Sequence, residues 1–271
     1  MKSVLPRLRP VSARAQVRLT DAEARVPGPL PDEEELERAT KQETKRISKL
    51  QRIFWADGRR ALLIVLQGRD ASGKDGTIRK VFGAVNPQGC QVHGFKVPTE
   101  EERQHDFLWR VHARVPPRSM IGIFNRSHYE DILVPRVREL LPKSVWSARY
   151  EQINDFEQLL AASGVTIVKF MLHISKAEQK RRFESRLSDP EKHWKFRAGD
   201  LDDRRRWRSF TEAYRDILRR TSTPWAPWYV VPADDKDVRN YLIASTIAEL
   251  LDGMELRYPD PDPDIEGLTI E

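Results

Sequence analysis

The chain has 271 residues, 39% of them hydrophobic and 32% charged, a mixture that excludes a fibrous protein and wholesale disorder. Its longest apolar run, residues 61–66, is far shorter than the about 20 residues that cross a bilayer as a helix. The single cysteine, Cys90, excludes an intrachain disulfide, and without Cys/His clusters a structural zinc site is not expected. We therefore expect a globular, cytoplasmic protein with no membrane partner.

The net charge of +6 is concentrated in one segment. Residues 180–220 hold 14 Lys or Arg and 8 Asp or Glu, so this segment carries the whole excess and the rest of the chain is formally neutral. Such a block suits nucleic acid, a membrane surface or a polyanionic substrate. The alternative is a solvated helix surface crossed by salt bridges.

Both ends of the chain differ in composition from the middle. Residues 1–30 contain several prolines, and up to Thr20 they carry five basic and no acidic residues, which predicts an extended basic tail. A transit peptide is the alternative, but the stretch lacks a helical apolar face. Residues 258–271 are acidic and proline-rich, so they are expected to be extended and peripheral.

The middle of the chain alternates between helical and strand patterns. Residues 32–55 form one expected amphipathic helix, whose charged face is exposed or used for dimerisation. Short apolar runs predict strands at 61–66, 91–95, 119–124, 165–172 and 228–231. Helices are expected at 75–84, 100–111, 146–162, 176–187, 203–219 and 237–251. This alternation predicts a doubly wound parallel sheet within a single domain over residues 31–257.

A phosphate-binding pattern directly follows the first expected strand. Gly68 to Lys74 (GRDASGK) fits G-x4-G-K and precedes a helix start, which is the context that a P-loop requires. Its backbone N–H groups and Lys74 would hold a polyphosphate group. Asp75 stands where the common pattern has a Mg²⁺-ligating Ser or Thr, so Asp70, Thr77 or a carboxylate from elsewhere would take that task.

Polar residues also follow the third expected strand. The run from Asn125 to Asp131 (NRSHYED) suits a Walker B position, in which either Glu130 or Asp131 brings an acid to the metal and Arg126 clamps a phosphate. The alternative is that His128 and Tyr129 only pack and the acids cap a helix.

The basic block is typical of a mobile lid in P-loop kinases. Arg182 and Arg186 lie at helical spacing before the run from Lys192 to Arg197, and such a segment closes over the transferring group and excludes water. Its tryptophans fit stacking on a base, although packing is the commoner role of such residues.

Taken together, these motifs resemble the polyphosphate kinase 2 family. The resemblance rests on residues 68–77 (GRDASGKDGT), 86–90 (NPQGC), 95–102 (FKVPTEEE), 105–110 (HDFLWR), 124–131 (FNRSHYED) and 189–196 (DPEKHWKF). The family tolerates Asp where Asp75 stands. The segment from Asn125 to Asp131 resembles the single-domain subgroup called class III, which accepts both nucleoside monophosphates and diphosphates.

The resemblance implies an α/β P-loop kinase fold: three α/β/α layers around a central parallel sheet, thymidylate-kinase-like, with a helical lid at about 180–220. It implies reversible phosphoryl transfer from inorganic polyphosphate to ADP, giving ATP, and to AMP, giving ADP, with Mg²⁺ or Mn²⁺ as the ion. Transfer would be direct and in line, with no protein nucleophile. A homodimer or homotetramer is expected.

The resemblance also assigns roles to residues. Those expected to bind polyphosphate are Gly68, Asp70, Ala71, Ser72, Gly73, Lys74, Asp75 and Gly76. Those expected to bind the nucleotide are Arg118, Asn125, Arg126, Glu130, Arg182 and Lys192. Asp70 and Asp131 would bind the metal, and Asp70, Lys74, Arg126, Asp131 and Arg182 would be catalytic, with Arg182 closing from the lid.

Two other readings remain open from the residues. An ATP-dependent nucleoside monophosphate kinase shares the P-loop and the lid, and only the donor separates it from the first interpretation. A nucleic-acid-binding or scaffold protein would use the basic block without turnover. The polyphosphate reading needs no nucleic-acid partner.

Overall fold

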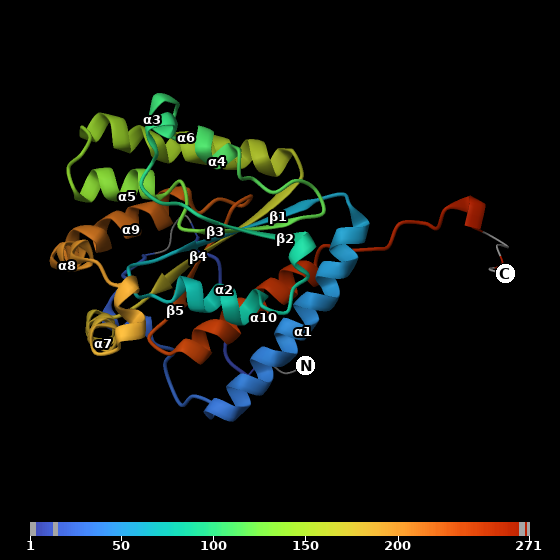
Figure 1. The fold of residues 1–271 in the computed structure, drawn as a ribbon, viewed down its shortest axis with the longest axis horizontal. Helices are drawn as coiled ribbons and strands as arrows, with labels where there is room; N and C mark the ends of the chain where they lie inside the picture. Colours follow the sequence, from blue (N-terminus) through green and yellow to red (C-terminus); the bar gives the residue numbers. More distant parts are fainter. Residues whose placement is uncertain (1–3, 13–15, 266–268, 270–271) are drawn as a thin grey trace.

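The structure, a computed structural model, describes residues 4–12, 16–265 and 269. Five parallel strands form one sheet in the order β2-β3-β1-β4-β5, with helices on both faces (Figure 1). The strands are β1 (Ala61–Gln67), β2 (Cys90–Gly94), β3 (Ile121–Asn125), β4 (Val165–His173) and β5 (Trp228–Pro232). The central strand β1 pairs with β3 on one side and β4 on the other, so the segments that follow these strands meet at one edge of the sheet.

The helices form two layers around this sheet. On one face lie α1 (Glu33–Asp57), α2 (Lys74–Phe82) and α10 (Lys236–Asp252). On the other lie α4 (Trp109–His112), α5 (Glu130–Val137), α6 (Lys143–Ala162) and α9 (Trp207–Thr221). The remaining helices are α3 (Glu100–Gln104), and α7 (Lys176–Leu187) and α8 (Ala198–Arg205), which lie at one end of the sheet (Figure 1). The expected three-layer α/β/α arrangement is confirmed.

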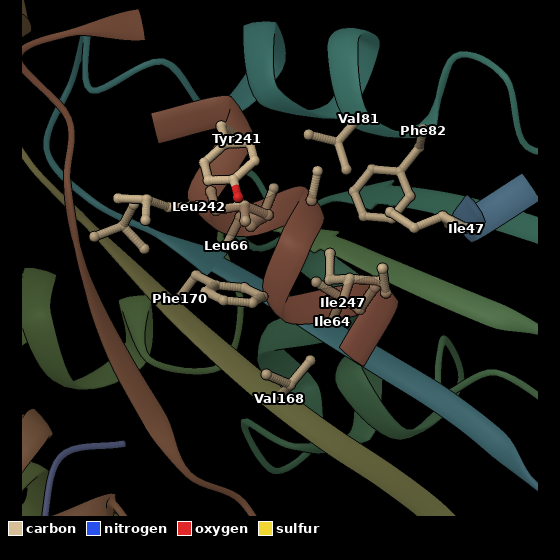
Figure 2. Close-up of a cluster of buried hydrophobic side chains, with 14 of the residues drawn as sticks. Ile47, Ile64, Leu66, Val81, Phe82, Val168, Phe170, Tyr241, Leu242 and Ile247 are labelled. Atoms are coloured by element: carbon tan, nitrogen blue, oxygen red, sulfur yellow. The ribbon is translucent and has the colours of Figure 1, made fainter. Parts of the chain in front are cut away.

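Strand β1 shows why this sheet is buried on both faces. Its apolar side chains alternate, with Ile64 and Leu66 in one core and Leu63 and Val65 in the other. Figure 2 shows Ile64 and Leu66 in the first core, beneath side chains of α2 and α10. A strand apolar on both faces is stable only between two helical layers, as its sequence predicted.

The expected helix over residues 100–111 is interrupted. His105 is extended (φ −104°, ψ 173°) and ends α3. The Asp106 carboxylate then accepts from the N–H groups of Leu108 and Trp109, at 2.9 and 3.1 Å, and so begins α4. The side chain of Asp106 competes with the helical backbone for hydrogen bonds, which is why one apolar pattern became two short helices.

Two further elements differ from the expectation. The helix expected at 203–219 is two helices, α8 and α9, which meet at Arg206 (φ −86°, ψ 22°). Helix α5, which contains Pro135, was not among the expected helices. Pro135 has no N–H for the carbonyl of Asp131, and the guanidinium of Arg149 donates to that oxygen instead.

The basic N-terminal segment packs on the sheet edge. Pro10 forms an antiparallel bridge with Tyr229, and Val11 N–H donates to Trp228 O at 2.7 Å. Leu5 and Leu19 are buried, and Asp21–Ala24 forms a 3-10 helix. The described part of this segment therefore covers the β5 edge, which protects it from pairing with other chains.

The C-terminal segment leads away from the body of the protein (Figure 1). Residues 258–264 are exposed. The parts of the two predicted tails that fall on residues 1–3, 13–15, 266–268 and 270–271 lie outside the described residues. Within the part of the chain that the structure describes, no helix is long and apolar enough to span a membrane.

Candidate active site

The loop between β1 and α2 has the backbone of a phosphate cradle. Gly68 and Gly73 have φ of +151° and +103°, values that side chains disfavour, and a Cβ at Gly68 would lie 2.6 Å from Leu172 O. Helix α2 begins at Lys74, so the unpaired N–H groups of its first turn point toward the loop. An anion in the loop is favoured by these donors and by the positive end of the helix dipole.

Lys74 is buried within this loop. Its ammonium donates to Gly68 O at 2.7 Å and to Arg69 O at 3.3 Å. Burial, reinforced by the nearby Arg126, lowers the pKa of Lys74 to about 8. Lys74 therefore lies in the cradle with its ammonium bonded to backbone oxygens, while Asp70, Glu130 and Asp75 act on its charge from a longer distance.

Arg126 connects the loop to the segment after β3. Its N–H donates to Leu66 O at 3.0 Å, and its φ of +63° turns the chain sharply there. Its guanidinium donates to Asp70 at 2.5 Å and to Glu130 at 3.3 Å. Glu130, with help from Asp70, raises the pKa of Arg126 despite burial. The Arg126 guanidinium thus lies between the phosphate cradle and the start of α5.

Other predicted residues surround the start of α2. Asn125, at the end of β3, donates to Asp75 at 2.6 Å. Thr77 is buried and faces Asn240, with 3.5 Å between Oγ1 and Oδ1. The Ser72 hydroxyl is buried and has no hydrogen-bond partner among the described residues. Asp75 and Asn125 therefore face each other across the cradle, and Thr77 does not face it.

The two predicted metal ligands have different partners. Asp70 contacts Arg126, whereas Asp131 contacts Arg110 at 2.9 Å. Arg110 is itself held by Lys96 O at 2.8 Å and lies 3.6 Å from Glu102. No cluster of three or more metal-ligating side chains occurs among the residues described. Asp131 thus joins α5 to the segment after β2.

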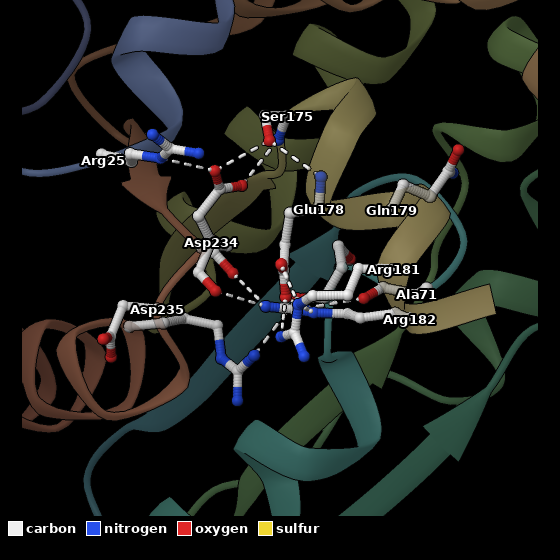
Figure 3. Close-up of polar contacts among 12 residues, drawn as sticks. Arg25, Ala71, Ser175, Glu178, Gln179, Arg181, Arg182, Asp234 and Asp235 are labelled. Carbon is white, nitrogen blue, oxygen red and sulfur yellow. Dashed lines mark hydrogen bonds and ion pairs between the residues drawn. The ribbon is translucent and has the colours of Figure 1, made fainter. Parts of the chain in front are cut away.

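The structure corrects the expectation that Arg182 closes from a lid. Arg182 is 9% exposed and lies beneath the loop (Figure 3). It donates to Ala71 O at 2.8 Å, to Ser72 O at 3.3 Å, and to the carbonyls of Ala233 and Asp234 at 2.7 Å each. Its Nε pairs with Glu178 at 2.7 Å. Because these contacts occupy the guanidinium, Arg182 supports the loop and does not cover it.

Arg118 lies away from the cradle, and the expected nucleotide-binding role of Lys192 stays a prediction. Arg118 is exposed and precedes β3, whereas the loop follows the carboxyl end of the parallel neighbour β1. Arg118 therefore lies at the amino-terminal end of the strands and the cradle at their carboxyl-terminal end. The expectation that Arg118 binds the nucleotide is corrected. Lys192 lies in the 3-10 helix Pro190–Lys195, half-exposed, where it pairs with Asp189 at 2.6 Å.

The structure brings residues to the site that the sequence did not predict. Arg69 lies 3.8 Å from the ring centre of Trp207 and donates to Thr211 at 2.5 Å, so it joins the loop to α9. Asp200, on α8, has its pKa raised by burial and by Asp70. Of the residues in these contacts, only Arg69 belongs to a motif that the sequence showed, the GRD of the P-loop pattern.

A buried polar cluster lies under the segment after β3. Lys169, on β4, donates to Glu157 at 2.5 Å and to the hydroxyl of Tyr129 at 2.8 Å. Glu157 also contacts His128 Nε2 at 3.1 Å. These four side chains are fully buried, and His128 follows Arg126 by two residues in the chain. Glu157 and Lys169 hold His128 and Tyr129 in the interior of the protein. This agrees with the alternative hypothesis that this pair packs.

The parallel sheet, the glycine cradle with its lysine and the arginine after β3 define a P-loop kinase. The sequence model of the polyphosphate kinase 2 family matches residues 31–259. The chain belongs to this family.

Similar proteins agree with this assignment. The AMP/ADP-polyphosphate phosphotransferase of Meiothermus ruber is 52% identical over 84% of this chain and 85% of its own length. The ADP-polyphosphate phosphotransferase of Rhodopseudomonas palustris is 46% identical over 82% and 81%. The crystal structure of polyphosphate kinase 2 from Arthrobacter aurescens has a TM-score of 0.91 at 37% identity and covers 98% of this chain and 97% of its own.

Proposed function

We propose that the protein transfers a phosphoryl group from inorganic polyphosphate to ADP, giving ATP, and to AMP, giving ADP. The observation that carries this function is the position of Arg126, whose guanidinium joins Asp70 in the cradle to Glu130 on α5. It lies between a site for a phosphate chain and a second polar segment. The relatives that share most of this chain are polyphosphate phosphotransferases for ADP or for both AMP and ADP. No feature favours ATP as the donor.

The residues divide the work between donor and acceptor. The N–H groups of the loop and the ammonium of Lys74 bind the end of the polyphosphate chain, and Lys74 exchanges its bonds to Gly68 O and Arg69 O for phosphate oxygens. Arg126 neutralises charge on the group in transfer, while Asn125 and Glu130 border the acceptor. No protein nucleophile is required because transfer depends on alignment and charge.

A magnesium ion is part of the proposal, and the chain offers it few ligands. Mg²⁺ is usually held by one or two carboxylates together with substrate phosphates and water. Asp70 fits, because it lies in the loop and its partner Arg126 has a side chain that is 39% exposed. Asp131 fits less well, since Arg110 holds its carboxylate. The bound ion would supply positive charge at the phosphates, and Mn²⁺ would serve in the same way.

Two further expectations, on the location and the oligomeric state, accompany this function. We infer a cytoplasmic location from the single free cysteine and the nucleotide substrates. A homodimer or homotetramer stays a prediction, which light scattering of the purified protein tests.

The function is tested by the choice of donor. Purified protein is incubated with Mg²⁺, AMP or ADP, and either long-chain polyphosphate or ATP, and the nucleotides are separated by chromatography. We expect ATP from ADP, and ADP followed by ATP from AMP, with polyphosphate as the donor. Lys74→Ala should lose at least about 100-fold in rate because one preorganised charge contact is lost.

Two outcomes would contradict the proposal. Product from AMP with ATP but none with polyphosphate would make the protein a nucleotide kinase. Unchanged turnover in Lys74→Ala would remove the cradle from the mechanism.

A further inference from the structure

A second buried arginine lies against the phosphate cradle from behind. Arg239, on α10, is 2% exposed. Its Nη1 donates to Ser72 O at 3.3 Å, and its Nη2 donates to Asn240 Oδ1 at 2.9 Å. A Cβ on Gly73 would overlap the guanidinium, and one on Gly76 would lie 3.6 Å from it. The guanidinium therefore occupies the space beside the first turn of α2.

Within the described part of the chain, no ion pair neutralises the charge of Arg239. Arg182, its neighbour under the loop, pairs with Glu178 at 2.7 Å. No carboxylate among the described residues forms an ion pair with Arg239, although Asp235 and Asp237 act on it at longer range. Asp235 is engaged as the cap of α10, where it accepts from the N–H groups of Asp237 and Val238. Arg239 is thus a buried cation with neutral hydrogen-bond partners.

This position is costly for the protein without its substrate. A cation is disfavoured at the amino end of a helix, where the dipole is positive, and Arg239 lies at the start of α2. Burying a charge without a paired anion costs free energy that packing alone does not return. Burial and Arg182 lower the pKa of Arg239 to about 10, which leaves it charged near neutral pH.

A bound polyanion would remove this cost. The donor proposed above places several negative charges on the other side of a loop that is one backbone thick at Gly73. We propose that Arg239 is a positioning residue whose uncompensated charge is the internal counter-charge of the polyphosphate end. The inference rests on the proposed function. Arg239 also fixes the carbonyl of Ser72 outward, so the loop N–H groups stay directed at the anion.

The proposal makes stability and binding change in opposite directions. Arg239→Met keeps the length of the side chain and removes the charge. Without ligand, its thermal midpoint should equal or exceed that of the wild type. Its Kd for tripolyphosphate with Mg²⁺, measured by calorimetry without nucleotide, should rise about 10-fold or more.

Asn240→Asp tests the charge without removing the arginine. This isosteric change gives Arg239 a carboxylate partner at the existing 2.9 Å contact. It should also weaken tripolyphosphate binding by about 10-fold and should not lower the midpoint of the ligand-free protein. In steady state, both variants should raise KM for polyphosphate and leave KM for ADP within about 2-fold, because Arg239 lies on the donor side.

Arg181→Met is the matched control. Arg181 is a basic residue near the same loop, but it is exposed and pairs with Glu178 at 2.5 Å (Figure 3). Its removal should change the tripolyphosphate Kd by less than about 2-fold, since exposed charges are screened by solvent.

The results separate failure of this inference from failure of the function. Wild-type protein that binds no tripolyphosphate would overturn the proposed donor. Wild-type binding with an unchanged Kd in Asn240→Asp would overturn the role of Arg239. A ligand-free midpoint that falls in Arg239→Met with no change in Kd would show that Arg239 is only a packing residue.

Discussion

The ammonium of Lys74 is hydrogen-bonded to backbone oxygens of the phosphate cradle. This ammonium is shared between Gly68 O and Arg69 O, and burial lowers its pKa. Substrate phosphates would replace neutral oxygens with charged ones. The affinity of Lys74 for its proton must therefore rise when the donor binds, so donor binding and protonation of Lys74 favour each other.

This coupling predicts the pH dependence of the reaction. The pKa of Lys74 is about 8 in the free protein, so kcat/KM for polyphosphate should fall as pH rises through about 8. With donor bound the pKa is higher, so kcat should persist to higher pH. The measurement is a pair of pH profiles from 6.5 to about 10. Coinciding alkaline limbs, or no fall in kcat/KM, would contradict this role for Lys74.

The sequence predicts such residues only where they form a local pattern. Lys74, Asp70 and Arg126 follow strands directly, and the topology brings them together as expected. Arg239 carried no signal because it reaches the loop through the packing of α10, far along the chain. Arg182 was recognised as important, but its direction depends on tertiary contacts with Ala71 and Asp234.

At the scale of elements, the connection from β3 to α5 is fixed by a buried ion pair. Lys169 from β4 and Glu157 from α6 meet beneath His128 and Tyr129, which lie in the same segment as Arg126. Arg126 itself has a strained φ of +63°, so its direction relies on support from the surrounding structure. The cluster thus anchors the segment that carries Arg126.

We expect this pair to be sensitive to removal of one partner. Lys169→Met leaves Glu157 buried without its cation, which should cost about 3–5 kcal/mol in free energy of unfolding. The double variant Lys169→Met with Glu157→Gln removes both charges and keeps an acceptor for Tyr129. It should recover most of that loss. Urea denaturation measures both, and a single variant that loses less than about 1 kcal/mol would refute this account.

Element boundaries were predictable where apolar periodicity and caps agree. Helix α1 begins after its Asp32 cap, whose carboxylate accepts from Glu35 N–H at 2.7 Å, as the acidic start indicated. The break at Asp106 and helix α5 were missed because each depends on a side chain that replaces a backbone partner. The Asp106 carboxylate accepts from the N–H groups of Leu108 and Trp109 just before α4, and the Arg149 guanidinium donates to the carbonyl that Pro135 leaves without a partner.

At the scale of the whole molecule, the loops of the candidate site lie at the end of the sheet where its strands have their carboxyl ends. The loops after β1 and β3 face each other because the two strands pair in register, Leu66 beside Asn125. The basic segment 180–220 surrounds this edge through α7, α8 and α9, and Arg69 ties the loop to α9 at Thr211. The alternation of helical and strand patterns predicted the parallel sheet, and the family resemblance implied three layers. The strand order and the inward turn of the basic side chains required the folded chain.

This arrangement suits transfer of the phosphoryl group between two substrates bound side by side. In the proposed function the donor end binds in the cradle, Arg126 lies between the cradle and α5, and no described residue is needed as a covalent carrier. The central claim is therefore direct transfer of the phosphoryl group within one site.

The most direct test is a rapid-quench experiment with radiolabelled polyphosphate, Mg²⁺ and enzyme in excess, with and without ADP. We predict that label enters ATP in the first turnover and that no label stays on the protein in either mixture. Protein-bound label that forms without ADP, and then passes to ATP when ADP is added, would contradict direct transfer.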